Sequence, residues 1–299
     1  MNHRTLLPFL LLLPLLAACK PSRSAKGTAD VPALTVSIEP LRYFTEALAG
    51  PYFTVSSLVP GGMSPETYDP TPRQLVELSG SVACLLTGHL GFEQVWHERL
   101  QSAAPDVAFV DLSEGLPLIH EEEGHGHEGH HHHSGGIEPH IWNSPANASL
   151  IATHILQTLC RLDPEHRSYF EARHDSLQTC IHRVDSLTRQ WLQRPEARHA
   201  FLIYHPALSY YARDYGLRQV AIEEEGKEPT PEALRRLIDL CRSEQIGVIF
   251  VQPEFDTRHA ELIARQTGTR IVRINPLAYQ WDEEMLRVAR ELAGEAQPL

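Results

Sequence analysis

The chain has 299 residues, and its 38 acidic residues outnumber its 26 basic ones to give a formal net charge of −12. This acidity argues against nucleic acid as a partner, because phosphates would be repelled, and it favours the attraction of cations. None of the five cysteines belongs to a Cys-x-x-Cys pair, which argues against a thiolate zinc site.

The first predicted element is a secretory signal at residues 1–18. A basic start precedes the apolar run Leu6–Ala18, which is shorter than the roughly 20 residues of a membrane-spanning helix. The run ends in Leu16-Ala17-Ala18-Cys19, which resembles a bacterial lipobox. This resemblance predicts that Cys19 is lipidated and that the polar residues 19–30 tether the protein to a membrane. The alternative is an ordinary signal peptide in which Cys19 has no role.

Strands and helices alternate through the first half of the chain. The predicted strands are Ala33–Ile38, Phe53–Val59, Val82–Thr87 and Asp106–Leu112, and the helices are Pro40–Ala49, one that opens at Thr71-Pro72, and Phe92–Ala103. Short apolar strands between helices predict a parallel sheet covered on both faces. Residues 31–162 are therefore expected to form an N-terminal α/β lobe.

A low-complexity segment at residues 120–135 interrupts this lobe. Its histidines alternate with acidic residues and glycine, and they are His120, His125, His127, His130, His131, His132 and His133. Such a composition cannot build a core or hold one geometry, so we expect loose, rapidly exchanging metal binding. Two interpretations remain open: a metal antenna or sensor beside a tighter site, and a solvated loop whose metal affinity is incidental.

Two helices follow the His-rich segment. The first opens at Ser144-Pro145 and runs to about Leu162, and the second is predicted over residues 163–194, with apolar positions spaced by three or four residues. At 1.5 Å per residue the second helix would be roughly 45 Å long, a length that suits a strut between two lobes. Cys160 and Cys180 lie on these neighbouring helices. A disulfide between them is one alternative, and free buried thiols are favoured.

A second alternation of strands and helices occupies residues 195–299, the predicted C-terminal lobe. The strands are His199–Tyr204, Leu217–Ile222, Ile246–Val251 and Arg270–Ile274, and the helices are Pro206–Tyr215, Glu232–Glu244, Asp256–Thr267 and Asp282–Ala293. Ligands of parallel α/β sheets lie at the carboxyl ends of the strands. The residues that follow the strands are therefore candidates for a site: 61–69 and 113–143 in the first lobe, and His205, 252–256 and Asn275 in the second.

Three motifs stand at these strand ends. They are VPGGMSPETYDPTP (59–72), GIEPHIWNSP (136–145) and YHPALSYYARDYG (204–216). In this order, with the His-rich insertion before the second motif and KEPTP (227–231) before a helix, the chain resembles the zinc/manganese class of ABC-transporter substrate-binding proteins. The resemblance implies an α/β fold of two lobes, each with a small parallel sheet flanked by helices. One long backbone helix would join the lobes, with a metal site in the cleft between them.

The resemblance assigns metal ligands residue by residue. His140 in EPHIW and His205 in YHPAL match ligand histidines, whereas Glu66 stands where the family commonly has a histidine, and a carboxylate oxygen can replace the imidazole nitrogen. The family's usual Asp after the last strand corresponds to Asn275, a weak zinc ligand. Asp282 or water could complete the shell instead. The alternatives are that Glu66 is a surface acid, that Asn275 caps a turn, and that Asp282 is the N-cap of the last helix.

The function that the resemblance implies is the capture of Zn(II) for the membrane permease of an ABC importer. The protein would be an exported lipoprotein of the cell envelope and not an enzyme. Two imidazoles with oxygen ligands also suit Mn(II) or Fe(II), while the His-rich segment favours zinc. An envelope-anchored zinc hydrolase is an alternative, but the sequence contains no HExxH and no Gly-x-Ser-x-Gly motif to support it. An adhesin, a role attributed to some members of the family, is another.

Overall fold

Two four-stranded parallel sheets form the framework of the computed structural model, which describes residues 31–120, 136–224 and 226–294. The first sheet has the order β2-β1-β3-β4. Its strands are β1 (Ala33–Val36), β2 (Thr54–Ser57), β3 (Ser81–Leu86) and β4 (Ala108–Asp111). The second sheet repeats this logic in the order β6-β5-β7-β8. Its strands are β5 (Ala200–Ile203), β6 (Arg218–Ala221), β7 (Val248–Val251) and β8 (Arg270–Arg273). The predicted pair of parallel sheets is confirmed.

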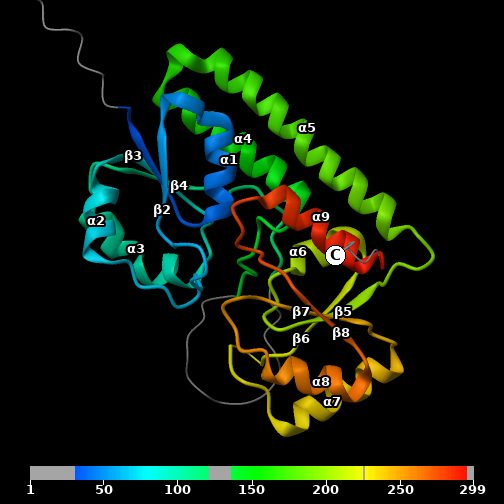
Figure 1. The fold of residues 1–299 in the computed structure, drawn as a ribbon. Helices are drawn as coiled ribbons and strands as arrows, with labels where there is room; N and C mark the ends of the chain where they lie inside the picture. The colour runs from blue at the N-terminus through cyan, green and yellow to red at the C-terminus, as the bar shows by residue number, and fades with distance from the viewer. Residues whose placement is uncertain (1–30, 121–135, 225, 295–299) are drawn as a thin grey trace, which may run out of the picture. The chain divides into compact units, whose positions relative to one another are not determined.

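The helices of the first lobe begin where the sequence carries capping signals. They are α1 (Glu39–Ala49), α2 (Pro72–Ser79), α3 (Gly91–Ala103) and α4 (Pro145–Leu162). Thr71 and Gln74 form a reciprocal capping box at α2, and the Ser144 hydroxyl accepts a hydrogen bond from the Asn147 amide at α4. In Figure 1, α2 and α3 lie on the other side of the first sheet from α1 and α4. Both faces of the sheet are therefore covered, as its apolar strands require.

The long helix α5 (Arg167–Leu192) runs beside both lobes (Figure 1). Its 26 residues make it about 39 Å long. It packs against α1 and α4 of the first lobe and against α9 (Trp281–Leu292) of the second. The helix is shorter than predicted from Asp163 because Pro164–His166 form a separate 3-10 turn.

The second lobe contains three more helices, α6 (Ser209–Tyr215), α7 (Pro231–Ser243) and α8 (Arg258–Thr267). The sequence predicted that the helix after β5 begins at Pro206, but α6 begins at Ser209. The cause is a tight turn after the strand, in which the Ala207 amide donates to the carbonyl of His205 over 2.7 Å. This turn directs His205 out of the sheet before the helix starts.

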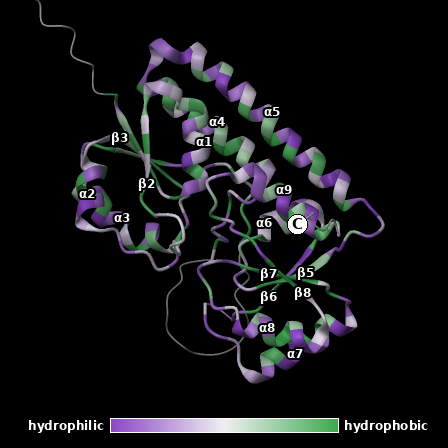
Figure 2. Ribbon diagram, in the orientation of Figure 1, coloured by the Kyte–Doolittle hydropathy of each residue, from purple (hydrophilic) through white to green (hydrophobic). Residues whose placement is uncertain are grey.

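Alternate residues of the second sheet face two different hydrophobic cores. Phe201 and Phe250 belong to the larger core, which continues through α5 into the first lobe, whereas Leu202 and Ile249 belong to a smaller core with α7 and α8. This alternation follows from the period of two residues in a strand. Figure 2 shows apolar residues along inner strands such as β3 and β7, whereas the edge strand β2 is paler. Residues from Val31 onward form one compact unit that includes both lobes.

Two tryptophans tie the lobes together near the proposed site. The indole nitrogen of Trp142 donates to the carbonyl of Pro276, and that of Trp281 donates to the carbonyl of Trp142, each over 2.8 Å. Both side chains are buried, and the indole nitrogen is the one polar atom of each. The two hydrogen bonds therefore hold the lobes together at this point. Of the helices that the structure describes, none has the length and apolar character needed to span a bilayer. Cys84, Cys160 and Cys241 are buried free thiols, and Cys180 is a free thiol that is only half-buried.

Candidate metal centre

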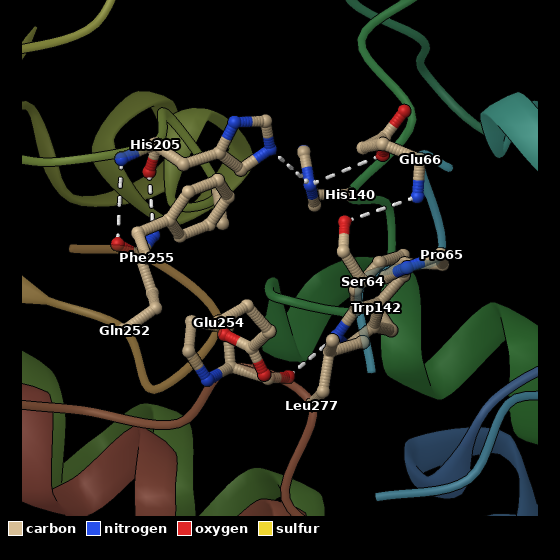
Figure 3. Close-up of a pocket in the computed structure, with 12 residues that line it drawn as sticks. Ser64, Pro65, Glu66, His140, Trp142, His205, Gln252, Glu254, Phe255 and Leu277 are labelled. Atoms are coloured by element: carbon tan, nitrogen blue, oxygen red, sulfur yellow. Dashed lines mark hydrogen bonds and ion pairs between the residues drawn. The ribbon is translucent and has the colours of Figure 1, made fainter. Parts of the chain in front are cut away.

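Glu66, His140 and His205 converge in a pocket between the two lobes, although they are remote in sequence (Figure 3). One ligand atom from each residue lies within 4.8 Å of those of the other two. The His140 Nε2 atom is 3.1 Å from the His205 Nε2 atom and 3.8 Å from the Glu66 Oε1 atom. Among the described residues this is the one group of three or more His, Cys, Asp or Glu side chains with such spacing.

His140 is held by a buried carboxylate two residues before it. The Glu138 Oε1 atom accepts hydrogen bonds from the His140 backbone amide over 2.9 Å and from the His140 Nδ1 atom over 2.5 Å. The other Glu138 oxygen accepts from the Ser209 hydroxyl at 2.6 Å, and the Tyr210 hydroxyl donates to the Glu138 carbonyl at 2.8 Å. Residues of α6 in the second lobe thus support a ligand candidate carried by the first lobe.

His205 has the same kind of partner within its own lobe. Its Nδ1 atom lies 2.7 Å from the Oε1 atom of Glu223, a buried carboxylate that follows β6. The Phe255 ring stacks on the imidazole with a centroid distance of 5.1 Å and an interplanar angle of 19°. Gln252 bonds both the amide and the carbonyl of His205. Backbone, ring plane and Nδ1 are therefore all fixed.

The two carboxylates determine which nitrogen of each histidine is free. An ionised carboxylate only accepts hydrogen bonds, so each Nδ1 atom carries the proton and each Nε2 atom presents a lone pair. Two lone pairs that face each other over 3.1 Å repel unless a proton or a cation lies between them. A tetrahedral zinc ion with Zn–N distances of 2.0–2.1 Å would place neighbouring ligand atoms about 3.3 Å apart. The observed spacings of 3.1 and 3.8 Å are near this value.

Glu66 reaches the same point from the loop between β2 and α2. The carbonyl of Pro65 accepts a hydrogen bond from the Phe92 amide at 3.1 Å, and the Glu66 amide donates to the Ser64 hydroxyl at 3.3 Å. The Glu66 Oε1 atom is buried and accepts no hydrogen bond from any described residue. A buried, unpaired carboxylate oxygen is costly, and a cation beside it would remove that cost.

The electrostatics of the site favour positive charge. Burial alone would lower the pKa of His140, but the carboxylates of Glu138, Glu66 and Glu223 outweigh it and raise the pKa above its ordinary value. Burial opposes ionisation of Glu138, but the charge of His140 and hydrogen bonds lower the pKa of Glu138 overall. The pocket thus stabilises a cation at the Nε2 atoms, whether it is a proton or a metal ion.

The other predicted ligands have different partners. The Asn275 Oδ1 atom accepts a hydrogen bond from the Leu277 amide at 3.1 Å, so this side chain caps a turn. The Asp282 Oδ2 atom lies 3.6 Å from the Cys180 Sγ atom, and Asp282 is outside the Glu66, His140 and His205 cluster. Asp282 is not the N-cap of α9 either, because Gln280 takes that position. His120 is exposed and pairs with Ile137, while Cys19 and residues 125–133 lie outside the described residues.

Sequence reasoning gave no individual role to three glutamates near the site, although Glu138 and Glu254 fall inside the candidate segments. Glu138 was visible in the EPH motif and Glu223 at the end of a strand, but only the fold brings each carboxylate to its histidine. Glu254 lines the pocket and has a buried Oε1 atom without a hydrogen-bond partner in the described part of the chain. Burial raises the pKa of Glu254, against the opposing effects of its own backbone amide and of His205.

Comparisons with known proteins agree with this geometry. Residues 34–289 match the family model for the zinc-uptake complex component A, periplasmic. The iron-binding protein YfeA of Yersinia pestis is 27% identical over 261 residues, which cover 85% of this chain and 79% of YfeA. The zinc-binding lipoprotein AdcA of Streptococcus pneumoniae is 25% identical over 279 residues, which cover 90% of this chain but only 54% of AdcA.

The fold has close counterparts among solved structures. A crystal structure of ZnuA matches with a TM-score of 0.81 and 36% identity, and the match covers 89% of this chain and 99% of that one. The family model spans both lobes and all three residues of the cluster. The chain therefore belongs to the family of the periplasmic zinc-uptake complex component A, the metal-binding proteins of ABC importers.

Proposed function

We propose that this protein captures Zn(II) as cargo for an ABC importer and holds it with Glu66 and the Nε2 atoms of His140 and His205. The observation that carries the proposal is the pair of Nε2 atoms 3.1 Å apart, each on a ring whose Nδ1 atom faces a buried carboxylate. Such an outer carboxylate orients a ligand histidine and raises its basicity. Rings arranged in this way bind a cation without first having to reorganise.

The fourth position of the ion is proposed to hold water. Tetrahedral zinc needs four ligands and the cluster supplies three, while Asn275 and Asp282 are both engaged elsewhere. An exchangeable water ligand suits a protein that must hand its ion to a permease, since the next ligand can enter at that position. The lobes are joined by α5 and by the Trp142 bonds, so capture is proposed to require small local motions rather than wide closure.

Manganese and ferrous iron are the alternative cargoes. The carboxylate of Glu66 makes the donor set harder than three imidazoles would, and harder oxygen ligands favour these ions. Relatives of the chain are named for zinc and for iron, so family membership does not determine the metal. The identity of the cargo has to be argued from the ligands of the site. The Irving–Williams order places zinc above both ions at a site with two imidazoles, and zinc is therefore the cargo proposed here.

The proposed location is the outer side of a cell membrane. Relatives of the family are named as lipoproteins of ABC transporters, which supports an envelope-associated place of action. Lipidation at Cys19 is the finer part of this proposal. Metabolic labelling with radioactive palmitate should mark the wild-type protein and not Cys19→Ser. Equal labelling of both proteins would contradict the anchor.

Calorimetry on the metal-free protein tests the cargo. Zinc should bind at one tight site, and Mn(II) should bind more weakly and be displaced by one equivalent of zinc. Crystals of the loaded protein, measured at the zinc and manganese absorption edges, should place the anomalous peak between Glu66, His140 and His205. A tight ion located anywhere else in the molecule would overturn the proposal.

A further inference from the structure

Gly91, the first residue of α3, lies against the residue that we propose as the carboxylate ligand. A Cβ atom added to Gly91 would stand 2.6 Å from the carbonyl oxygen of Glu66, 3.0 Å from its Oε2 atom and 3.2 Å from its Cα atom. Real Cβ atoms essentially never approach within 3.0 Å of another heavy atom. Gly91 does not have a positive φ angle, so the requirement for glycine here is one of space and not of backbone conformation.

Neither side of this contact is free to retreat. The start of α3 is anchored by the buried Glu93 carboxylate, which accepts hydrogen bonds from the Thr87 amide at 2.9 Å and from the Leu90 amide at 3.3 Å. The ligand loop is attached to the same helix by the Phe92 amide, which donates to the carbonyl of Pro65 at 3.1 Å.

A second bond joins the loop to α3 further along. The Trp96 indole nitrogen donates to the Asp69 carboxylate over 2.8 Å. The segment from Pro65 to Asp69 is thus bonded to α3 on both sides of Glu66. A side chain at position 91 would have to push the middle of that segment away while its two ends stay attached.

We propose that Gly91 is the positioning residue of the metal site: its missing side chain lets the backbone and carboxylate of Glu66 reach the two histidines. The proposal deepens the proposed function, because it requires that Glu66 binds the cargo ion. The Glu66 carboxylate also lies beside the N-terminus of a helix of 13 residues, where the helix dipole favours negative charge. A side chain at position 91 would therefore displace Glu66 from its present position beside the helix end.

The test compares Gly91→Ala with Gly61→Ala. Gly61 lies in the same loop five residues before Glu66, and a Cβ atom there would meet nothing within 4 Å. Zinc calorimetry should show that Gly91→Ala weakens the tight site by up to about tenfold, the loss expected when the Glu66 carboxylate is removed altogether, while Gly61→Ala binds as wild type. The visible spectrum of the Co(II)-loaded protein should change in Gly91→Ala alone, because it reports the ligands of the metal.

Glu66→Ala and the double variant Gly91→Ala/Glu66→Ala separate the possible outcomes. If Gly91 acts through Glu66, the substitution at position 91 adds no further loss of zinc affinity once Glu66 is gone. An equal loss in both backgrounds, wild-type binding by Gly91→Ala, or a Gly91→Ala protein that does not fold would each overturn the proposal for Gly91. Wild-type zinc binding by Glu66→Ala would instead overturn Glu66 as a ligand, and so would touch the proposed function itself.

Discussion

His140 and His205 enter the candidate site with their rings fixed by buried carboxylates, at 2.5 and 2.7 Å, whereas Glu66 arrives from a loop and has no such partner. The histidine side chains are 6% and 16% exposed, and that of Glu66 is 30% exposed. A buried ligand that is already oriented loses little entropy on binding, and water cannot easily take its place. The two histidines are therefore expected to supply most of the affinity, and Glu66 to adjust affinity and metal preference.

Removal of a histidine is the largest expected effect. Structural zinc sites bind with about 10–16 kcal/mol, so each of four ligands accounts for about 2.5–4 kcal/mol. His140→Ala and His205→Ala should each weaken zinc binding by roughly 100–1,000-fold in calorimetry. His182→Ala, an exposed position on α5, is the matched control and should bind as wild type. Tight zinc binding by His140→Ala or His205→Ala would contradict the view that the two histidines supply most of the affinity.

Substitution of an outer carboxylate comes next. Glu138→Gln should weaken zinc binding at pH 8 by about 10–100-fold, because the ring of His140 loses its orienting partner. Glu224→Gln is the control, since Glu224 is exposed and pairs with Arg236 on the surface. An unchanged zinc affinity in Glu138→Gln would show that the buried carboxylate contributes nothing to metal binding by His140.

The same variant predicts a shift in pH dependence. His140 must be neutral to bind a metal, and the nearby carboxylates raise its pKa above the ordinary 6.5. Wild-type affinity should therefore start to fall at a pH above 6.5 as the solution is acidified, by about tenfold for each further pH unit. In Glu138→Gln one of the carboxylates that oppose the effect of burial is gone, so the pKa of His140 should be lower. The fall in zinc affinity should then begin at a lower pH. Titrations at several pH values measure both onsets, and an onset that moves upward would contradict the assignment.

Changes at Glu66 should have a smaller effect. Water can replace a carboxylate that is partly exposed, so Glu66→Ala should weaken zinc binding by only about tenfold. Glu66→His should keep zinc affinity and lower that for Mn(II), since a third imidazole makes the donor set softer. Competition between the two ions measures this preference. A loss of zinc affinity in Glu66→Ala as large as that in His140→Ala would contradict the expected difference between the histidines and Glu66.

Deletion of residues 121–133 should have the smallest effect on the tight site. The segment's histidines and acids are interleaved with glycine, and we expect them to bind several ions loosely. Calorimetry should show fewer weak sites and a tight site whose affinity is within about twofold of wild type. Absence of any tight site in the deletion variant would falsify the expectation that the tight site forms without residues 121–133.

The strands, helices and ligand motifs were accessible from the sequence because their signals are local. Apolar runs, Pro at first helical positions and the Thr71–Gln74 capping pair act within a few residues, and most predicted elements appear with ends shifted only slightly. His140 and His205 were assigned as ligands through motifs at strand ends that resemble those of the metal-binding family. Prediction was less accurate where a turn intervened, as at Pro206, where the helix begins three residues later than expected.

By itself the sequence determined an acidic α/β chain with two parallel sheets and a long helix, while its resemblance to a known family pointed to candidate residues for a shared cation. Only the tertiary structure decided that Glu138 and Glu223 face the histidines, that Asp282 lies outside the cluster, and that a side chain at Gly91 would collide with Glu66. Periodicity and capping arise between neighbours in the chain. Distances between residues such as Glu66 and Gly91 depend on how separate loops pack, which no local pattern encodes.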